Sequence, residues 1–428
     1  MNHDIRIGML GFGTVGTGTY RMLVNNRDAI TNKVGHAMAI TRIGIRDSSK
    51  ERSLDASVFT TDLDSIVADP NIDVVCELIG GVEPAAELVE RALMNGKHVV
   101  TANKELIAKH GSRLVHLAKS RGLDLHYEAA VGGGIPLVQP LKHQLAGNDV
   151  IRMMGILNGT SNYILTKMEQ EGADFADALR EAQAAGYAEA DPTNDVEGID
   201  TSYKISILAS IAFGKQVLVE DIYREGISKV GITDIEYAKS WNYRIKLVGV
   251  VDAVGGDAVC VRVHPTMIPL THPLASVNGV YNALWLNGDF VGDVMFSGRG
   301  AGSDPTGSAV IGDLIDVGRN MVVGGSGSAI PYDTGMKTVP IDDVESAFYM
   351  RLRVLDRPKT LGEISMVFGE FGISIAEMQM KTLPNDQGEI VFLTHRASER
   401  DFAKALEQVG NLDAVAQVAA VIRVEDKA

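Results

Sequence analysis

The chain has 428 residues, of which 45% are hydrophobic and 22% are charged, and its formal net charge is -15 at pH 7. This length is too great for one core and predicts roughly two to four domains of ordinary globular composition. Because phosphate binding requires clustered lysine and arginine, the acidic balance argues against a nucleic-acid partner. The two cysteines, Cys76 and Cys260, exclude a disulfide framework and a multi-cysteine metal site, which favours a reducing compartment.

The first residues, MNHDIRIGML, place an acid where a signal peptide would be apolar and enter a strand pattern at once. Apolar runs such as ISILASIAF, residues 205–213, are much shorter than the ~18 residues that indicate a membrane span. We therefore expect a cytoplasmic protein that has no membrane partner.

Residues 1–135 alternate strand-like and helix-like segments, which is typical of βαβ units around a parallel sheet. Strands are predicted at 5–10, 37–46, 72–80, 97–102 and 123–131, and helices at 14–26, 83–96 and 104–122. The expected fold is α/β, a Rossmann-type doubly wound nucleotide-binding domain that part of 300–320 completes.

Residues 136–320 mix the two patterns and predict an α+β domain; its expected roles in substrate binding, catalysis and dimerisation follow from the family resemblance given below. Its predicted elements are a strand at 149–157, a hairpin over 279–298 that turns at 287–289, and helices at 161–171, 175–186, 199–214 and 305–321. A linker at 321–346, rich in Gly, Ser and Pro over 324–335, leads to residues 347–428. Their order of strand, helix, strand, strand, helix and strand predicts a small ferredoxin-like domain.

The stretch GFGTVG, residues 11–16, matches the G-x-G-x-x-G pattern of dinucleotide-binding folds. With 45 glycines in the chain the string alone is weak, but here it leaves a predicted buried strand and opens a helix. There the glycines permit a tight turn, and the helix N-terminus faces a pyrophosphate; a plain tight turn is the alternative. The predicted cofactor contacts are Gly11, Phe12, Gly13, Thr14, Val15 and Gly16.

The second predicted strand ends at IRDSSKER, residues 45–52, where an acid on the ribose 2′-hydroxyl would indicate NAD. Here Arg46 precedes Asp47, and Lys50 and Arg52 follow. Because cations near this position can pair with a 2′-phosphate, we expect NADP(H) in preference to NAD(H). Solvated loop charges are the alternative.

The segment DPTNDVEGIDTSYKISILASIAFG, residues 191–214, changes from charged to apolar in its middle. On a helix, Asp200 and Lys204 lie four residues apart on one face, and the run that follows is apolar on nearly every side. A lysine that enters a buried helix needs partners, which Glu189, Asp195 or Asp200 can provide. Buried paired charges are candidates for a functional site, and a surface ion pair is the alternative.

Cys76 lies in an apolar predicted strand, where most cysteines are inert. Hydride transfer to a carbonyl therefore fits better than oxidation through a thiohemiacetal, which would need a reactive cysteine.

The loop YEAAVGGGIP, residues 127–136, can turn several carbonyls inward to bind a hard cation, with Glu128 adding charge. A simple turn is the alternative for this loop.

Six segments together resemble homoserine dehydrogenase, in the longer form with a C-terminal ACT domain, over essentially the whole chain. They are GFGTVG, TANK (101–104), YEAAVGGGIP, ILNGTSNYIL (156–165), GYAEADPTNDVEGIDTSYK (186–204) and VHPTMIPLTHPLASVNGVYNALWLNGD. The segment 186–204 is highly specific, whereas the glycine motif is not. The resemblance implies NAD(P)-dependent interconversion of L-aspartate 4-semialdehyde and L-homoserine, on the route to threonine, methionine and isoleucine.

The resemblance also implies roles for single residues. Lys204 is expected to donate the proton to the carbonyl oxygen with Asp200 beside it, and Lys104, by the nicotinamide, is the rival donor. Gly186 and Glu189 are expected to hold the substrate, with Glu189 facing its ammonium group. The role of Asp195 stays open between a contact with substrate and support of the loop. The remaining implied contacts are Thr101 and Gly302 to the cofactor, and Glu128, Val131, Gly133 and Ile135 to a monovalent cation, Na⁺ or K⁺.

An ACT domain in this setting implies threonine as an allosteric inhibitor. ACT sequences carry a glycine after the proline of the first strand–helix turn, whereas the turn DRPKTL has Lys359 there. This departure puts amino-acid binding in question, because glycine permits close approach of a ligand to the backbone. We expect feedback inhibition by threonine and a homodimer or homotetramer; a domain that only supports dimerisation is the alternative.

Two other classes of protein are alternatives to a homoserine dehydrogenase. An inactive amino-acid sensor descended from the enzyme is disfavoured because Lys104, Glu189, Asp200 and Lys204 are all present. A phosphorylating semialdehyde dehydrogenase would need a reactive cysteine in the second domain, and Cys260 lies in the strand-like DAVCVRV instead.

Overall fold

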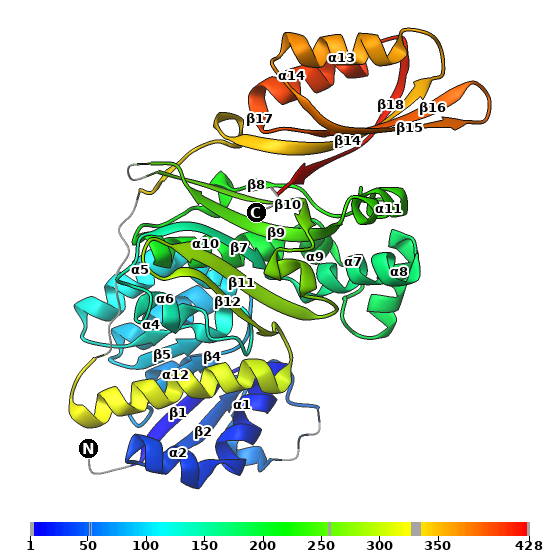
Figure 1. Ribbon diagram of the computed structural model, residues 1–428. Coiled ribbons are helices and arrows are strands. Elements are labelled where there is room, and N and C mark those ends of the chain that lie inside the picture. Colours follow the sequence, from blue (N-terminus) through cyan, green and yellow to red (C-terminus); the bar gives the residue numbers. More distant parts are fainter. Residues whose placement is uncertain (1–3, 51, 53, 256–257, 327–334, 426–428) are drawn as a thin grey trace. The chain divides into compact units, whose positions relative to one another are not determined.

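The structure, a computed structural model, describes residues 4–50, 52, 54–255, 258–326 and 335–425 and divides into two compact units (Figure 1). The first unit combines Met1–Val150, Tyr203–Glu220 and Asn282–Met336. The second combines Ile151–Ser202, Asp221–Tyr281 and Lys337–Ala428. Neither unit is one continuous segment, and residues 327–334 of the predicted linker lie outside the described residues.

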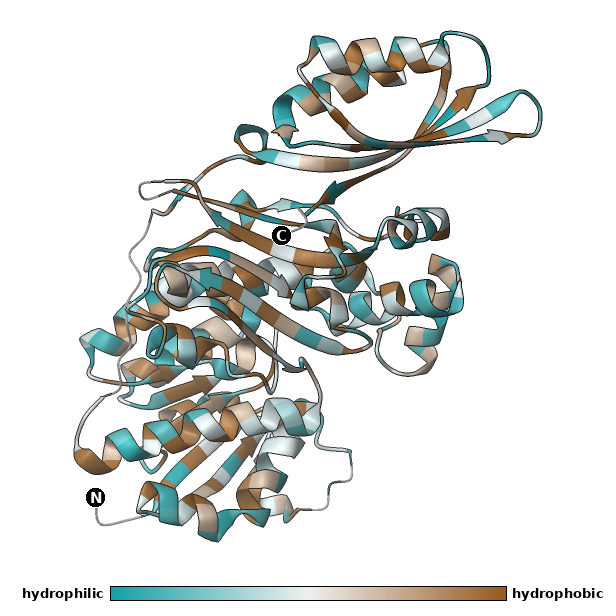
Figure 2. Ribbon diagram, viewed as in Figure 1, coloured by the Kyte–Doolittle hydropathy of each residue, from teal (hydrophilic) through white to brown (hydrophobic). Residues whose placement is uncertain are grey.

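The first unit contains a parallel sheet in the order β3-β2-β1-β4-β5-β6. This is the strand order of the doubly wound dinucleotide-binding fold, so the predicted fold class is confirmed. The strands are β1 (Ile5–Leu10), β2 (Met38–Gly44), β3 (Phe59–Thr60), β4 (Val74–Glu77), β5 (His98–Thr101) and β6 (Leu125–His126). They are rich in hydrophobic residues, as sheets covered on both faces require (Figure 2).

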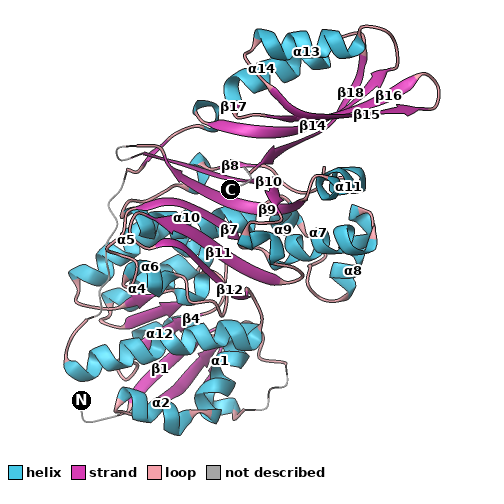
Figure 3. Cartoon of the chain, viewed as in Figure 1, coloured by secondary structure: helices cyan, strands magenta, loops and turns pink. Residues whose placement is uncertain are grey.

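Two layers of helices flank this sheet (Figure 3). One layer packs α1 (Thr14–Asn25), α2 (Arg27–Val34) and α12 (Ser303–Val323) together; the other contains α3 (Leu63–Ala68), α4 (Ala85–Met94) and α5 (Lys104–Ser120). Val310 and Leu314 of α12 share a core with Ile5 and Ile7 of β1. A helix from late in the chain therefore covers one face of the parallel sheet.

Three smaller elements complete the first unit. The helix α6 covers Val138–Lys142, and the strands β11 (Tyr281–Gly288) and β12 (Gly292–Arg299) form the predicted hairpin, whose connecting residues are 289–291 rather than 287–289. The strand predicted over 123–131 is much shorter than expected, because a 3₁₀ turn at Glu128–Ala130 follows β6 directly.

In the second unit the strands follow the order β7-β9-β10-β18-β14-β16-β15. They are β7 (Val150–Ile156), β9 (Tyr243–Ala253), β10 (Ala258–Pro269), β14 (Glu345–Leu355), β15 (Ile375–Leu383), β16 (Gln387–Thr394) and β18 (Val415–Val424). The helices are α7 (Gly159–Glu171), α8 (Phe175–Ala184), α9 (Thr193–Val196), α10 (Ile199–Phe213, continuing into the first unit), α11 (Ile232–Ser240), α13 (Thr360–Glu370) and α14 (Glu399–Gly410). Short strands lie at β8 (Tyr223–Arg224), β13 (Lys337–Thr338) and β17 (Ala397–Ser398).

The ferredoxin-like arrangement predicted for the last part of the chain is confirmed: β18, β14, β16 and β15 form antiparallel neighbours that share a core with α13 and α14. Its sheet does not end at β18. Thr266 and Met267 of β10 pair in parallel with Arg423 and Val424 of β18, so the ACT sheet and the sheet of residues 151–281 are continuous. No helix among the described residues is both long and apolar enough to cross a membrane.

Candidate functional site

Each glycine of the loop after β1 has a separate reason to be glycine. Gly11 has φ +102°, and a Cβ there would lie 2.7 Å from the carbonyl oxygen of Leu78. A Cβ on Gly16 would lie 2.5 Å from the carbonyl oxygen of Gly11. Around Gly13, in contrast, no described atom lies within 4 Å of such a Cβ, and no side chain caps α1. The first and third glycines permit tight packing, whereas the second leaves the helix N-terminus open to a phosphate.

A cleft of about 570 Å³ opens beside this loop, within the first unit. The predicted cofactor residues that line it are Gly11, Phe12, Gly13, Arg46 and Lys50. Thr14, Val15 and Gly16 continue from the loop into α1. The cleft therefore lies at the carboxyl ends of β1 and β2, next to the switch in strand order where doubly wound folds bind ligands.

The acid at the end of β2 is engaged by its own loop. Asp47 Oδ1 accepts hydrogen bonds from the backbone N–H of Ser49 at 2.8 Å and from its hydroxyl at 2.6 Å. These bonds lower the pKa of Asp47. Arg52 also donates to the Asp47 carbonyl oxygen at 2.9 Å, while Arg46 and Lys50 are exposed in the cleft wall.

Glu77, the last residue of β4, is a positioning residue that the sequence analysis missed. Its carboxylate accepts from the backbone N–H groups of Ile79 at 2.9 Å and Gly80 at 3.3 Å, and from the hydroxyl of Thr101 at 2.5 Å. Burial raises the pKa of Glu77, and these bonds oppose that rise. The residue shapes the loop at the cleft wall, and the signal available was an acid inside the apolar VVCELIGG.

Thr101 and Lys104 lie where β5 passes into α5. Asn103 caps that helix, since its Oδ1 accepts from the backbone N–H of Leu106 at 3.1 Å and its Nδ2 donates to the Gly81 carbonyl at 2.6 Å. The cap fixes the backbone from which the partly exposed Lys104 side chain begins.

Gly302, which precedes α12, lies close to the glycine loop. It has φ +124°, a conformation that favours glycine. The hydroxyl of the next residue, Ser303, donates to the Thr14 carbonyl oxygen at 2.8 Å, and a Cβ on Gly18 would overlap the Ser303 backbone. The structure thus brings Gly302 to the residues that open α1.

The predicted cation loop is held from behind by Glu128. Its carboxylate accepts backbone N–H bonds from Leu137 at 2.5 Å, Val138 at 2.8 Å and Gln139 at 2.7 Å. Its own N–H donates to Asp313 Oδ2 at 2.8 Å. The carboxylate is thus occupied by backbone, so a cation in this loop would be held by main-chain carbonyl oxygens, which suit a hard ion.

The same loop is packed against β12 and balanced by a buried lysine. Gly133 has φ +57°, and a Cβ there would lie 2.6 Å from the carbonyl of Gly300. Lys142 lies beneath, 3.9 Å from the centroid of the Tyr127 ring, and burial lowers its pKa to about 8. The predicted residues Val131, Gly133 and Ile135 are all buried in this loop. Across the described residues, no group of three or more His, Cys, Asp or Glu side chains could hold a metal ion.

Two of the three predicted catalytic residues, Asp200 and Lys204, lie in the first half of α10, and the third, Lys104, begins α5. Asp200 is 4% exposed and Lys204, one turn later on the same helix, is 9% exposed. Ile205, Ile207 and Leu208 beyond them are fully buried, as the apolar run predicts. The charged pair is therefore not a surface ion pair.

The predicted substrate residues Gly186, Glu189 and Asp195 lie in the second unit. Asn158, which the sequence analysis missed, donates from Nδ2 to Asp195 Oδ1 at 2.7 Å and to Asp200 Oδ2 at 2.9 Å. Gly186, with φ +74°, and Glu189 form the exposed turn after α8, which Gln183 supports by donating to the Glu189 carbonyl at 3.1 Å. The structure thus joins Asp195 to Asp200 and leaves the Glu189 carboxylate exposed.

A second pocket, of about 170 Å³, lies in the ACT domain at the turn between β14 and α13. Lys359 lies in its wall with φ +79°, in the left-handed region that glycine adopts without cost. The departure seen in the sequence therefore falls on a residue whose backbone still takes the conformation of glycine.

Glu389 of β16 connects this pocket to α11. It lines the pocket, and its carboxylate accepts from the Tyr237 hydroxyl at 2.9 Å and from Arg351 Nη1 at 3.2 Å. Arg351 Nε in turn donates to the buried Asp234 Oδ1 at 2.6 Å. Tyr237 and Asp234 both belong to α11, so one buried ionic network joins the pocket wall to that helix.

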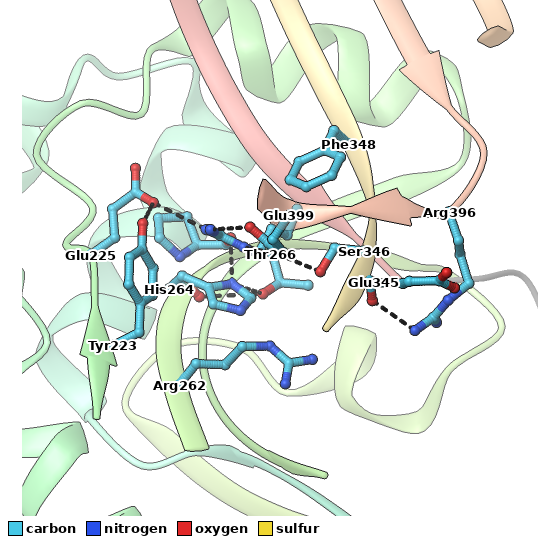
Figure 4. A network of polar contacts seen from close by, with 12 residues as sticks. Tyr223, Glu225, Arg262, His264, Thr266, Glu345, Ser346, Phe348, Arg396 and Glu399 are labelled. Carbon is cyan, nitrogen blue, oxygen red and sulfur yellow. Dashed lines mark hydrogen bonds and ion pairs between the residues drawn. The ribbon is translucent and has the colours of Figure 1, made fainter. Parts of the chain in front are cut away.

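A separate network fastens β18 (Figure 4). Glu399 accepts two hydrogen bonds from Arg423, Nε at 2.6 Å and Nη2 at 2.8 Å, and one from the Ser346 hydroxyl at 2.5 Å. On its other side Arg423 Nη1 donates to Glu225 at 3.3 Å, and its guanidinium lies 4.7 Å from the Tyr223 ring centroid. This two-pronged arginine–carboxylate pair ties β18 to the first residue of α14, and the contacts to Tyr223 and Glu225 tie it to the segment that begins with β8.

Both cysteines are buried and unbridged. Burial raises the pKa of the Cys76 and Cys260 thiols, which keeps them protonated and unreactive. A cysteine nucleophile, and with it the phosphorylating alternative, finds no support in either position.

Comparison with known proteins agrees with this geometry over the whole chain. Residues 11–128 match the family described as "Homoserine dehydrogenase, NAD binding domain", residues 136–315 the family "Homoserine dehydrogenase" and residues 348–414 the "ACT domain". Homoserine dehydrogenase of Synechocystis sp. is 43% identical over 431 residues, which cover 98% of this chain and 99% of that protein. The Bacillus subtilis enzyme is 40% identical, with 98% of each chain covered.

Solved structures extend the match to three dimensions. A homoserine dehydrogenase from Thiobacillus denitrificans has a TM-score of 0.93 and 42% identity, covering 99% of this chain and 98% of that one. A hyperthermophilic archaeal homoserine dehydrogenase in complex with NADPH has a TM-score of 0.63 and 28% identity, covering 73% of this chain and 97% of that one. The chain belongs to the homoserine dehydrogenase family, the NAD(P)-dependent oxidoreductases that act on the CH–OH group of homoserine.

Proposed function

We propose that Lys204 is the proton donor when L-aspartate 4-semialdehyde is reduced to L-homoserine. The supporting observation is its position: a lysine only 9% exposed, one helical turn after the buried Asp200. The nicotinamide, when bound, supplies the hydride. Lys204 protonates the oxygen as negative charge develops there, and Asp200 keeps the lysine charged. Lys104, at the first residue of α5, is the rival for the same proton.

The experiment that tests these roles compares Lys204→Ala with Lys104→Ala under saturating cofactor and homoserine. Loss of turnover in Lys204→Ala alone, with cofactor binding retained, supports the proposal. Near-normal turnover in Lys204→Ala assigns the proton to Lys104 or to water.

Substrate recognition is assigned to the turn after α8. The exposed Glu189 carboxylate suits the ammonium group that substrate and product share, and the left-handed Gly186 lets the backbone approach the ligand closely. Glu189→Gln should raise the KM for homoserine far more than it lowers kcat. An unchanged KM would remove Glu189 from the substrate site.

The cofactor is proposed to be NADP(H) in preference to NAD(H). Asp47 is engaged by Ser49, which leaves the exposed Arg46 and Lys50 in the cleft wall to meet a 2′-phosphate. The absorbance of the reduced nicotinamide gives kcat/KM for each cofactor directly. A higher kcat/KM with NAD would reject this assignment.

A monovalent cation, Na⁺ or K⁺, is proposed for the loop 128–135, bound by the carbonyl oxygens of Glu128, Val131, Gly133 and Ile135. The support is the double left-handed turn at Gly132 and Gly133 and the carboxylate held beneath it. Activity in a bulky organic-cation buffer should rise when NaCl or KCl is added at constant ionic strength. Equal activity in all these salts would reject the site.

The ACT domain is proposed to bind L-threonine and inhibit the enzyme. The pocket at Lys359 and its link through Glu389 to α11 support a route by which a ligand could affect the second unit. A titration of activity with L-threonine that stays flat to high millimolar concentrations would reject inhibition and leave a domain that only supports assembly.

The assembly is proposed to be a homodimer or homotetramer in the cytoplasm. Met378 and Met380 are exposed on β15, the outer strand of the ACT sheet, where a second copy could cover them. Light scattering on the purified chain gives its mass, and a monomer at micromolar concentration would reject the assembly.

A further inference from the structure

Asn158 makes three hydrogen bonds from one buried side chain. It stands between β7 and α7 and is 5% exposed. Its Oδ1 accepts from the Ser161 backbone N–H at 2.8 Å, which caps α7. Its Nδ2 donates to Asp195 at 2.7 Å and to Asp200 at 2.9 Å. The side chain therefore connects the starts of α7 and α10 with α9.

The direction of this amide is fixed by its partners. The Ser161 N–H can only donate, so it must meet the amide oxygen. Ionised carboxylates can only accept, so both must meet the amide nitrogen, and that nitrogen has two hydrogens, one for each. Rotating the amide by half a turn would place its nitrogen against the Ser161 N–H donor and its oxygen against the two carboxylate acceptors. The three contacts thus define one orientation of the amide, and the amide in turn restrains the two carboxylates that face it.

We infer that Asn158 is a positioning residue for the reaction, which holds Asp200 ionised and correctly aimed toward its helix neighbour Lys204. A hydrogen bond donated to a carboxylate favours its charged form. The amide also lies between two carboxylates and supplies each with a donor, so Asp195 and Asp200 can approach each other without both being destabilised. This inference rests on the proposed role of Lys204 and Asp200.

The same contact assigns a role to Asp195. Its carboxylate shares the Asn158 amide with Asp200, and its backbone belongs to the short α9. Asp195 therefore acts on the geometry of the site by fixing the segment between the Glu189 turn and α10. It holds the amide in place for Asp200.

Two substitutions separate this role from helix capping. Aspartate and serine cap helices about as well as asparagine, so Asn158→Asp and Asn158→Ser both retain the cap of α7. Asn158→Asp keeps the shape but removes both donors and adds a third carboxylate. Asn158→Ser has a single hydroxyl on a shorter side chain and cannot serve two carboxylates. The melting temperature should fall by only a few degrees in Asn158→Ser, and by more in Asn158→Asp, where a third buried carboxylate repels the other two.

The expected result is a fall in kcat of about 10- to 100-fold in both variants, with little change in the KM for the cofactor. In Asn158→Asp the acidic limb of the pH profile of kcat/KM should also move up by about one pH unit, because added negative charge raises the pKa of Asp200. A role confined to capping predicts normal kcat and an unmoved profile. Either of these results in a folded Asn158→Asp variant overturns the inference.

Asp200→Asn, measured beside these variants, distinguishes failure of the role proposed for Asp200 from failure of the role inferred for Asn158. Near-normal turnover in Asp200→Asn rejects the proposed role of Asp200 itself and with it the route assigned to Asn158. A poorly active Asp200→Asn beside a normal Asn158→Asp rejects Asn158 alone. If both lose activity, the double variant should be no slower than Asp200→Asn, since the two substitutions act on one group.

Discussion

In the first unit the phosphate end of the nucleotide cleft depends on main chain: three glycines, an uncapped helix N-terminus and a loop whose N–H groups are held by Glu77, with the side chains of Arg46 and Lys50 further along the wall. At the start of α10 the functional groups are side chains, with the amide of Asn158 between two carboxylates. The cleft is therefore sensitive to added atoms, whereas the carboxylate cluster is sensitive to changed charge at constant shape.

The largest expected effect is at the side-chain site. Lys204→Ala should lower kcat by about 10²- to 10⁴-fold, the range for loss of a positioned acid, while NADP(H) binding stays within a few-fold. Stopped-flow or steady-state turnover gives kcat, and fluorescence titration of the reduced cofactor gives its binding. Parallel loss of cofactor binding would place Lys204 in the cleft and weaken the contrast between the two regions.

The buried charges under the cation loop should appear in the pH dependence of stability. The Lys142 pKa is about 8 in the folded chain against an ordinary 10.5, so between these values the unfolded state binds more protons. Stability contributed at this residue therefore rises with pH over that window, by up to ~3 kcal/mol. Relative to Lys142→Met, the wild type should gain free energy of unfolding from about pH 7 to about pH 10. A pH-independent difference between the two would contradict the buried charged lysine.

At the glycine loop of the nucleotide cleft, one added methyl group should be enough to weaken cofactor binding. Gly13→Ala places its Cβ in space that no described atom fills, so stability should be nearly unchanged. The Kd for NADP(H) should nevertheless rise about tenfold, or ~1.4 kcal/mol, because the methyl enters the region where a pyrophosphate approaches the backbone. Gly312→Ala in α12, where a Cβ also meets nothing within 4 Å, is the matched control. Equal cofactor binding in both variants would mean that the phosphate does not approach Gly13.

The smallest effect concerns backbone conformation alone. Lys359→Gly removes the ~1–2 kcal/mol conformational penalty that a residue with a side chain has in the left-handed region. It also gives the unfolded chain more conformational freedom, which lowers stability by ~0.5–1 kcal/mol. A net stabilisation of up to ~1 kcal/mol should follow, measured by urea unfolding. A clear destabilisation would show that the lysine side chain makes a favourable contribution that outweighs its backbone.

Local features of the fold were predictable from the sequence, whereas most of the pairings between distant strands were not. β1 begins and ends at the expected residues, because an apolar run and the glycine-rich turn after it define the strand. The pairing of β18 with β10 left no local signal, since each strand reads as an ordinary strand wherever its partner lies. Most of 221–281 was also unassigned, although it contains α11 and β9.

The same distinction holds for the candidate site. The glycine loop and the pair Asp200 and Lys204 are short-range patterns whose spacing indicates their geometry. Asn158 and Glu77 could not be found in this way, since their importance depends on groups that the fold brings to them. A polar residue inside an apolar stretch indicates that the position needs a hydrogen-bond partner, but the sequence does not show which residue that partner is.

The strand β18 has a consequence for how the chain is made. Residues 415–424 emerge from the ribosome after every strand that they pair with. Until then, the edge of β10 at Thr266 and Met267 and the inner edge of β14 expose unpaired N–H and C=O groups. The nascent chain therefore carries an open edge on β10 from residue 269 onward and a second on β14 from residue 355 onward, and a single late strand closes both at once.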